Sequence, residues 1–155
     1  FNVYKKRIAA SIAAAKGIVE DKYLATIEKG VAKMDEIVAQ LKADMAGGKF
    51  LNIFAIATPL QQAFARLTYA WMHVMGLTVA IPKMKELVGD LKGEDRDKLL
   101  AENNEAAYYT GRVLSGQFYL GAEFMKYFGH VEYLLAGETA VNKASGVIFT
   151  GAIEE

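Results

Sequence analysis

The sequence predicts an all-α protein, an antiparallel (up-and-down) four-helix bundle followed by an irregular C-terminal tail. Apolar residues recur at steps of three and four along most of the chain, which is the spacing of one helix face. The chain contains only two prolines, and no segment alternates as a half-buried strand would. A length of 155 residues fits one domain, so we expect a single helical domain over 1–155.

The overall composition excludes several classes of function. The 18 basic and 18 acidic side chains give no net charge, which argues against a nucleic-acid-binding or anionic-membrane surface. The absence of cysteine excludes zinc fingers, iron–sulfur centres and thiol nucleophiles. Five polar or charged residues interrupt the apolar segment 50–81 and argue against a membrane span: Asn52, Gln61, Gln62, Arg66 and His73. We expect a cytoplasmic protein and, because the sequence begins at Phe1 without an initiator Met, a piece of something larger.

Two helices are predicted in the first third of the chain. A short first helix is marked by apolar residues with helical spacing: Ile8, Ile12, Ala15 and Val19. A change of phase beside Gly17 predicts a break before the second helix. The second helix carries a seven-residue apolar repeat over 24–45, made of Leu24, Ile27, Val31, Met34, Val38, Leu41 and Met45. Gly47 and Gly48 are expected to end it.

A third helix is predicted over 59–81, with Thr58 as its cap and Pro59 at its first position. It would be about 34 Å long and would end before Pro82, because helix is disfavoured at a residue preceding proline. An apolar stripe marks its inner face: Leu60, Phe64, Leu67, Trp71, Val74 and Ile81. A helix over 50–57, bent at Pro59, is an equal alternative, and further turns over 83–91 are compatible with the pattern.

One long last helix is predicted from Leu99 to Gly137, after a loop over 89–93 and an acidic first turn. Its inner face is formed by Leu99, Ala106, Tyr109, Val113, Leu120, Phe124, Tyr127, Val131 and Leu134. Four glycines inside it would each cost about 1 kcal/mol relative to alanine, so we expect close helix packing there: Gly111, Gly116, Gly121 and Gly129. The pattern then fades, and 142–155 is predicted to be irregular.

The segment 50–82 is unusual because Arg66 is its only charged residue. A helix that is apolar on nearly all sides must be covered on nearly all sides. We therefore expect it to be either the centre of the bundle or a surface that meets another chain or domain. Trp71 is predicted to anchor the core, and Met72 and Met75 are predicted to point outward.

The two histidines, His73 and His130, invite a metal or haem interpretation. Di-iron bundles need a glutamate three positions before each histidine, but Ala70 and Tyr127 stand there. A methionine–histidine haem pair, Met34 or Met45 with His130, is conceivable but has nothing to fix its geometry. We expect both histidines to be ordinary packed or surface residues, and the chain to bind neither metal nor haem.

Other residues that could suggest chemistry also have structural explanations. An aromatic series is predicted to be core rather than a ligand pocket: Tyr108, Tyr109, Phe118, Tyr119, Phe124, Tyr127 and Phe128. The isolated charges Arg66, Arg112 and Glu123 are expected in salt bridges or at the rim of the core. The glycines after residue 110 follow no strand and do not form a phosphate loop. We predict no catalytic, cofactor-binding or metal-binding residue in this chain.

The order of several short segments resembles the extra C-terminal domain of acyl-CoA dehydrogenases of the 3-methylmercaptopropionyl-CoA dehydrogenase type. The last long helix of that domain has an aromatic pair, a basic residue, a second aromatic pair and a late glycine. The matching residues are 106–112, 117–119 and 134–138, preceded by 57–60, Phe64 and 70–72. The resemblance covers most of the chain from about Tyr23 to Asn142.

The resemblance implies a parent flavoprotein of fatty-acid metabolism, whose FAD-binding core oxidises an acyl-CoA thioester and carries the catalytic glutamate. None of those residues has a counterpart here, so this chain alone would have no activity. Its expected partners are the flavin-binding core or a second copy of itself, with acyl-CoA bound only through the parent. The alternative is a free-standing helical interaction module without enzyme activity.

Overall fold

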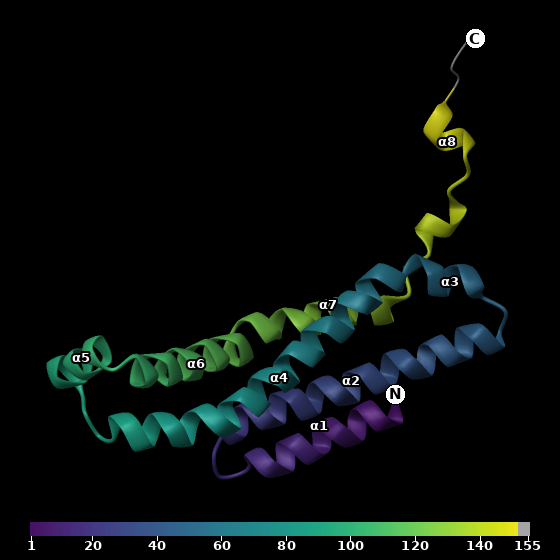
Figure 1. The fold of residues 1–155 in the computed structure, drawn as a ribbon. Helices are drawn as coiled ribbons and strands as arrows, with labels where there is room; N and C mark the ends of the chain where they lie inside the picture. The colour runs from purple at the N-terminus through teal and green to yellow at the C-terminus, as the bar shows by residue number, and fades with distance from the viewer. Residues whose placement is uncertain (152–155) are drawn as a thin grey trace.

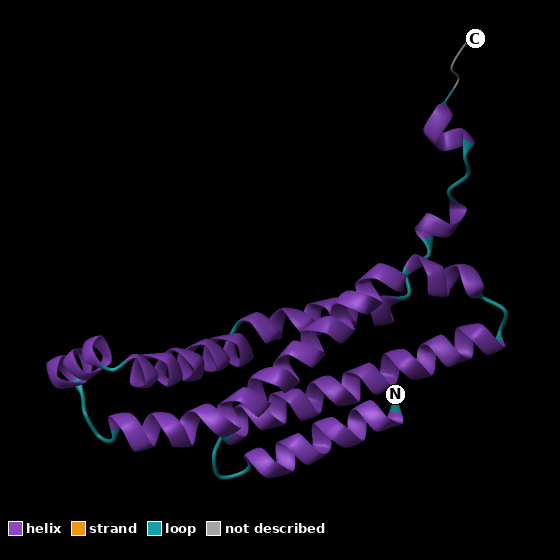
Figure 2. Ribbon diagram, in the orientation of Figure 1, coloured by secondary structure: helices purple, strands orange, loops and turns teal. Residues whose placement is uncertain are grey.

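The protein is helical throughout the part that the computed structural model describes, residues 1–151 (Figures 1 and 2). This confirms the predicted all-α class, and no strand occurs in that range. The α-helices are α1 Asn2–Ala15, α2 Asp21–Ala46, α3 Phe50–Ala55, α4 Ala57–Val88, α5 Gly93–Glu102, α6 Asn104–Gly121, α7 Lys126–Ala136 and α8 Val147–Thr150. Two short 3-10 helices, η1 Glu123–Met125 and η2 Ala140–Lys143, complete the list. None of the helices in this range is long and apolar enough to cross a membrane.

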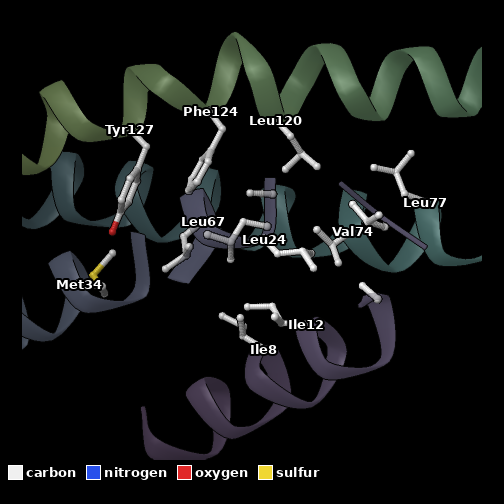
Figure 3. Close-up of a cluster of buried hydrophobic side chains, with 14 of the residues drawn as sticks. Ile8, Ile12, Leu24, Met34, Leu67, Val74, Leu77, Leu120, Phe124 and Tyr127 are labelled. Atoms are coloured by element: carbon white, nitrogen blue, oxygen red, sulfur yellow. The ribbon is translucent and has the colours of Figure 1, made fainter. Parts of the chain in front are cut away.

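Helix α4 lies in the middle of the molecule and packs on α1, α2, α6 and α7, most extensively on α6. Figure 1 shows α2 running back along α1, α4 running back along α2, and α6 followed by α7 returning along α4. Their inner faces share one core, part of which is shown in Figure 3. Side chains of α6, η1 and α7 point there toward those of α2 and α4, with Ile8 and Ile12 of α1 on the other side.

The predicted positions of the first two helices are confirmed, although Val19, expected on the first helix, is buried in the connection after α1. Ile8, Ile12 and Ala15 are buried, and α1 ends just before Gly17, whose positive φ of 77° allows the chain to turn.

On α2, Leu24, Ile27 and Met34 of the predicted repeat are buried, and Val31, Val38 and Leu41 are partly buried against the core. The helix ends at Ala46, before the Gly47-Gly48 pair. Met45, the last residue of the repeat, lies in the last turn of α2 and is exposed.

Helix α4 differs from the prediction at both ends. It begins at Ala57 after a separate short helix, α3, so the predicted capping role of Thr58 is wrong and the alternative of a helix over 50–57 is closer. It also continues through Pro82 to Val88. Proline lacks the helix-forming N–H, but Ile81 before it belongs to the core, and Met84 after it packs against the core. Figure 1 shows α4 changing direction in its last turns, as expected for a helix that contains proline.

The predicted long last helix is divided into α5, α6, η1 and α7. The first division occurs at Asn103, whose backbone is extended and whose side-chain oxygen accepts from the backbone N–H groups of Glu105 and Ala106, both at 3.0 Å. The second division occurs at Ala122, where the backbone leaves the helical region. The apolar pattern did not reveal the second division because the buried positions continue on the same side of α6 and α7. Helix α5 has no buried residue, so the predicted inner-face position of Leu99 is wrong: Leu99 is only partly buried and lies outside the core. The predicted end at Gly137 is confirmed, with φ +65°.

The four interior glycines have different surroundings. At Gly116, a Cβ would lie 2.9 Å from the Leu77 side chain, so the predicted close packing is confirmed between α4 and α6. At Gly121 the neighbour is the ring of Tyr23, at an ordinary 3.5 Å. Gly111 and Gly129 have nothing within 4 Å, so close packing does not explain them.

After Gly137 the turn η2 contacts α3, where the Asn142 side-chain amide donates a hydrogen bond to Asn52 Oδ1 at 2.8 Å, and the chain beyond η2 extends away from the other helices (Figure 1). The described part of the chain after Gly137 contains only the single turns η2 and α8. The apolar side chains of this part are exposed: Val141, Val147, Ile148 and Phe149. The predicted irregular tail over 142–155 therefore has two helical turns, and its last four residues lie outside the described range.

Candidate interaction surface

The outer side of the contact between α4 and α6 brings together several residues that stand out in the sequence. The ring of Tyr119 on α6 stacks on His73 of α4, with 4.5 Å between the ring centres. Tyr69, one turn earlier on α4, approaches Tyr119 edge to face at 6.5 Å. The Tyr119 hydroxyl donates a hydrogen bond to the backbone carbonyl of Arg66 at 3.2 Å. These contacts fix the two helices side by side along this edge.

The contact continues toward the C-terminal end of α4, where a glycine allows an arginine to approach the backbone. A Cβ on Gly76 would lie only 3.2 Å from the Arg112 guanidinium, so Arg112 lies directly over α4 at this point. A hollow of about 210 Å³ is lined by Gly76, Val79, Ala80, Tyr108, Tyr109 and Arg112. Arg112, an exposed residue, therefore forms one wall of this hollow, and the other walls are apolar or aromatic.

Large apolar side chains around this contact are open to solvent. On α4, Tyr69 and Met72 are each 57% exposed and Val79 is 60% exposed, and on α6 Tyr108 is 60% exposed. We call this surface the α4–α6 face; it comprises Arg66, Tyr69, Met72, His73, Met75, Gly76, Val79, Tyr108, Arg112 and Tyr119. The predicted outward orientation of Met72 and Met75 is confirmed.

The expectation that segment 50–82 forms the centre of the bundle is correct for one side of α4 only, and a contact of the other side with another chain or domain stays a prediction. One side of α4 is the centre of the core, with Ala63, Leu67, Ala70, Val74 and Leu77 buried. The opposite side is exposed and apolar. Exposed apolar surfaces of this kind on single chains typically mark interaction sites.

The charges of the α4–α6 face are all positive. Its guanidinium groups are those of Arg66 and Arg112, and neither forms a salt bridge within residues 1–151. Of the two expected settings, salt bridge or rim of the core, the rim is therefore the one found: Arg112 is exposed and Arg66 is partly buried, with its Nε enclosed without a hydrogen-bond acceptor. Glu123 does form its expected ion pair, with Lys126 at 2.7 Å. No Asp or Glu occurs over 57–85 of α4 or over 106–122 of α6 and its end.

His73 adds no third positive charge at neutral pH. Its partial burial, and secondarily the positive charge of Arg112, lower the pKa of the imidazole below its ordinary value. Burial likewise raises the pKa of the Tyr119 phenol, although the nearby Arg66 opposes this effect. Both rings of the stacked pair are consequently neutral at pH 7.

The two histidines lie in different surroundings. His73 belongs to the α4–α6 face, whereas His130 on α7 lines a shallow surface hollow with Pro59, Gln62 and Tyr133. No methionine lines that hollow, and of the conceivable haem ligands Met34 is buried in the core while Met45 is exposed at the end of α2. Within residues 1–151, no three His, Asp or Glu side chains gather as metal ligands would.

The aromatic series is only partly core. Phe124 and Tyr127 are fully buried and stack at 5.1 Å, as predicted. Tyr108 and Phe118 are exposed, and for them the core prediction is wrong. The reason is geometric: neighbours on a helix point about 100° apart, so two adjacent aromatic residues cannot both face the core.

Trp71 lies at the edge of the core rather than within it. Its indole N–H donates to the Ser11 hydroxyl at 2.8 Å, and its ring meets Tyr4 edge to face at 5.7 Å. Trp71 therefore joins α4 to α1 and remains partly exposed. The prediction of a buried core anchor is too strong.

Sequence reasoning missed two glycines that bring helices together. Gly76 admits Arg112 to the α4–α6 face, and Gly30 on α2 lies under the rings of Phe124 and Tyr127. A Cβ at Gly30 would lie 2.9 Å from Phe124 and 3.4 Å from Tyr127. The available signal was a glycine inside an otherwise regular helical pattern, which indicates a packing or functional reason.

Comparison with known proteins connects this fold to one family. No curated protein and no solved structure matches the chain. The family model described as "Acetyl-CoA dehydrogenase C-terminal like" matches residues 5–145, which include every helix from α2 to α7. Because this match covers nearly the whole sequence, the chain belongs to the acetyl-CoA dehydrogenase C-terminal-like family.

Proposed function

We propose that this chain is the accessory C-terminal helical domain of a FAD-dependent acyl-CoA dehydrogenase-like enzyme, and that it acts by packing on its partner rather than by chemistry of its own. Family membership supports association with such a parent enzyme. The packing role is supported by one observation: large apolar side chains on the adjacent helices α4 and α6 are exposed together on the α4–α6 face. Covering them would remove apolar surface from water, which favours association.

The parent would supply the parts of the reaction that this chain does not. In this proposal the flavin-binding core holds FAD and the catalytic base, and the acyl-CoA thioester binds through the parent. The sequence resemblance favours a parent of the 3-methylmercaptopropionyl-CoA dehydrogenase type, acting in the cytoplasm. Residues 1–155 form a single domain in this proposal, and the packing partner is either the flavin-binding core or a second copy of the chain.

A free-standing interaction module is the second candidate function, and the same exposed face favours it. The two candidates differ in what precedes Phe1. A reading frame that continues upstream into a flavin-binding segment supports the accessory domain. A reading frame that starts at this domain supports the free-standing module.

The proposal can be tested by comparing the full reading-frame product with residues 1–155 produced alone. We expect the full product to carry FAD and to oxidise an acyl-CoA with an artificial electron acceptor. We expect residues 1–155 to be helical, to have no flavin absorbance and to be inactive. Stoichiometric flavin, a haem absorbance band or bound iron in residues 1–155 would contradict an accessory domain without chemistry.

A further inference from the structure

We infer that a pocket at the C-terminal ends of α2 and α7 binds a small organic cation, an ammonium group carried on a short aliphatic stem. The pocket has a volume of about 430 Å³, which is typical of small-molecule sites. Both helix ends lie near α3 in Figure 1. We call it the α2–α7 pocket; it is lined by Gln40, Asp44, Lys49, Asn52, Ile56, Leu134, Gly137, Glu138 and Thr139. None of these residues belongs to the α4–α6 face, so the inference is independent of the packing role proposed above.

Asp44 is a buried carboxylate with one oxygen open to the pocket. The residue is only 8% exposed, and its Oδ1 accepts a hydrogen bond from the Gln40 side-chain amide at 3.2 Å. Its other oxygen, Oδ2, has no hydrogen-bond donor and no ion-pair partner within residues 1–151. This oxygen is not sealed from solvent, so it remains open to a ligand in the pocket. A carboxylate largely removed from water is costly unless a cation or further donors meet it.

The helix ends around the pocket add to its negative potential. Asp44 lies in the last turn of α2, and that turn contains no basic residue. Glu138 directly follows Gly137, the residue that ends α7. The C-terminal end of a helix carries a partial negative charge, which disfavours a carboxylate and favours a cation. Two carboxylates at two helix C-termini therefore make a site where a bound cation would be stabilised.

Among the lining residues, Lys49 alone is cationic, and it leaves both carboxylates unpaired. Its ammonium forms no ion pair within the described part of the chain. Its backbone N–H donates to the Asp44 carbonyl at 2.8 Å, so it closes the turn after α2 rather than neutralising the side chain. Counting Asp44 and Glu138 against Lys49, the lining side chains carry a net charge of −1.

The lining favours an organic cation over a metal ion. Within residues 1–151, no three His, Asp or Glu side chains gather as metal ligands would, whereas calcium and magnesium take six or more oxygen ligands. Ile56 and Leu134 provide apolar walls that suit an aliphatic stem. An ammonium group can donate to Asp44 Oδ2 and to the second oxygen of Glu138, since Glu138 Oε1 already accepts from the Ala140 N–H at 2.6 Å.

The test uses n-butylammonium chloride as the probe, titrated into isotope-labelled residues 1–155 at low salt. Nuclear magnetic resonance follows the side-chain amide signals of Gln40 and Asn52, which both line the pocket. n-Butanol and n-butyrate are matched probes with the same stem but no charge or a negative charge. The variant Asp44→Asn removes the charge and keeps an oxygen for Gln40. The control Glu28→Gln removes one negative charge from an exposed position of α2 outside the pocket.

We expect n-butylammonium to shift both amide signals saturably, and n-butanol and n-butyrate to leave them unchanged. Asp44→Asn should weaken the binding about tenfold or more, because the charge-assisted hydrogen bond is lost, and Glu28→Gln should leave it unchanged. Lys49→Met should strengthen it, because a like charge is removed from the pocket.

Three results would overturn the inference. The first is the absence of a saturable shift with n-butylammonium. The second is equal binding by Asp44→Asn and the wild type, or equal binding of n-butanol and n-butylammonium. The third is loss of binding in Lys49→Met, which would show that the pocket selects an anionic group instead. All three leave the proposed packing role standing.

Discussion

Tyr127 shows how much a single residue can organise in this fold. Its hydroxyl donates a 2.7 Å hydrogen bond to the backbone carbonyl of Gly30, joining α7 to α2 inside the core. Its ring lies against Gly30, where a side chain would collide with Phe124 (Figure 3 shows both rings). Burial raises the pKa of this phenol far above its ordinary value, and the nearby Tyr4 adds to the rise.

We predict that Tyr127 makes the folded protein sensitive to alkaline pH. Above about pH 10, tyrosine ionises in the unfolded chain but Tyr127 remains protonated in the folded one, so the unfolded state binds fewer protons. The stabilisation is complete below the unfolded pKa and is lost as the pH rises above it. Urea unfolding between pH 7 and 11 should show a steep loss for the wild type, approaching about 1.4 kcal/mol per pH unit for this group.

The variant Tyr127→Phe separates this effect from those of the other tyrosines. It should lose about 1 kcal/mol of unfolding free energy at pH 7, because the hydrogen bond to Gly30 is removed. Its alkaline loss should be shallower than that of the wild type, since phenylalanine does not ionise. Parallel slopes for both proteins would contradict the assignment to Tyr127.

Among the helices, local backbone chemistry ends helices at points where the apolar pattern predicts one continuous helix. The side-chain oxygen of Asn103 accepts hydrogen bonds from two backbone N–H groups at the start of α6, and this cap separates α6 from the highly charged α5. An N-terminal cap of this kind satisfies donors that have no partner within the helix.

We predict that Asn103→Ala lowers the free energy of unfolding by about 1 kcal/mol. The neighbouring change Asn104→Ala is the matched control, because Asn104 is the first residue of α6 and its side chain makes no hydrogen bond in the described structure. Chemical denaturation of both variants is the measurement. Equal losses for the two variants would show that the cap contributes no more than its neighbour.

Some of the helices and helix ends could be predicted from the sequence, and others could not. The repeat over 24–45 and the glycines at 17, 48 and 137 predict α1, α2 and the end of α7, because periodicity and positive φ are local properties. The passage of α4 through Pro82 was not predictable in the same way. It depends on neighbours that bury Ile81 and pack against Met84, and no local rule contains that information.

For the whole molecule, the decisive feature is that α4 is central on one side and exposed on the other. The sequence identified Arg66 and Arg112 as isolated charges and Met72 as outward, so part of the candidate surface was predictable. The sequence did not predict that His73 stacks on Tyr119 or that Gly76 lies under Arg112. These contacts join α4 to α6, which are far apart in the chain. The sequence also could not decide between burial and exposure, because an apolar helix reveals neither how many neighbours it has nor on which side they lie.

The two tight glycine contacts have a consequence for how related sequences can diverge. Gly30 leaves room for Phe124, and Gly116 leaves room for Leu77, so in each pair the size of one residue limits the size of the other. Substitutions at these positions should therefore be inherited in pairs. In an alignment of family members, columns 30 and 124, and likewise 116 and 77, should covary inversely in side-chain volume, with alanine or serine at the glycine position accompanied by a smaller residue opposite. Independent variation in both pairs of columns would contradict this expectation. It would mean that the distance between the helices changes during evolution, so that a larger residue at one position needs no smaller residue at the other.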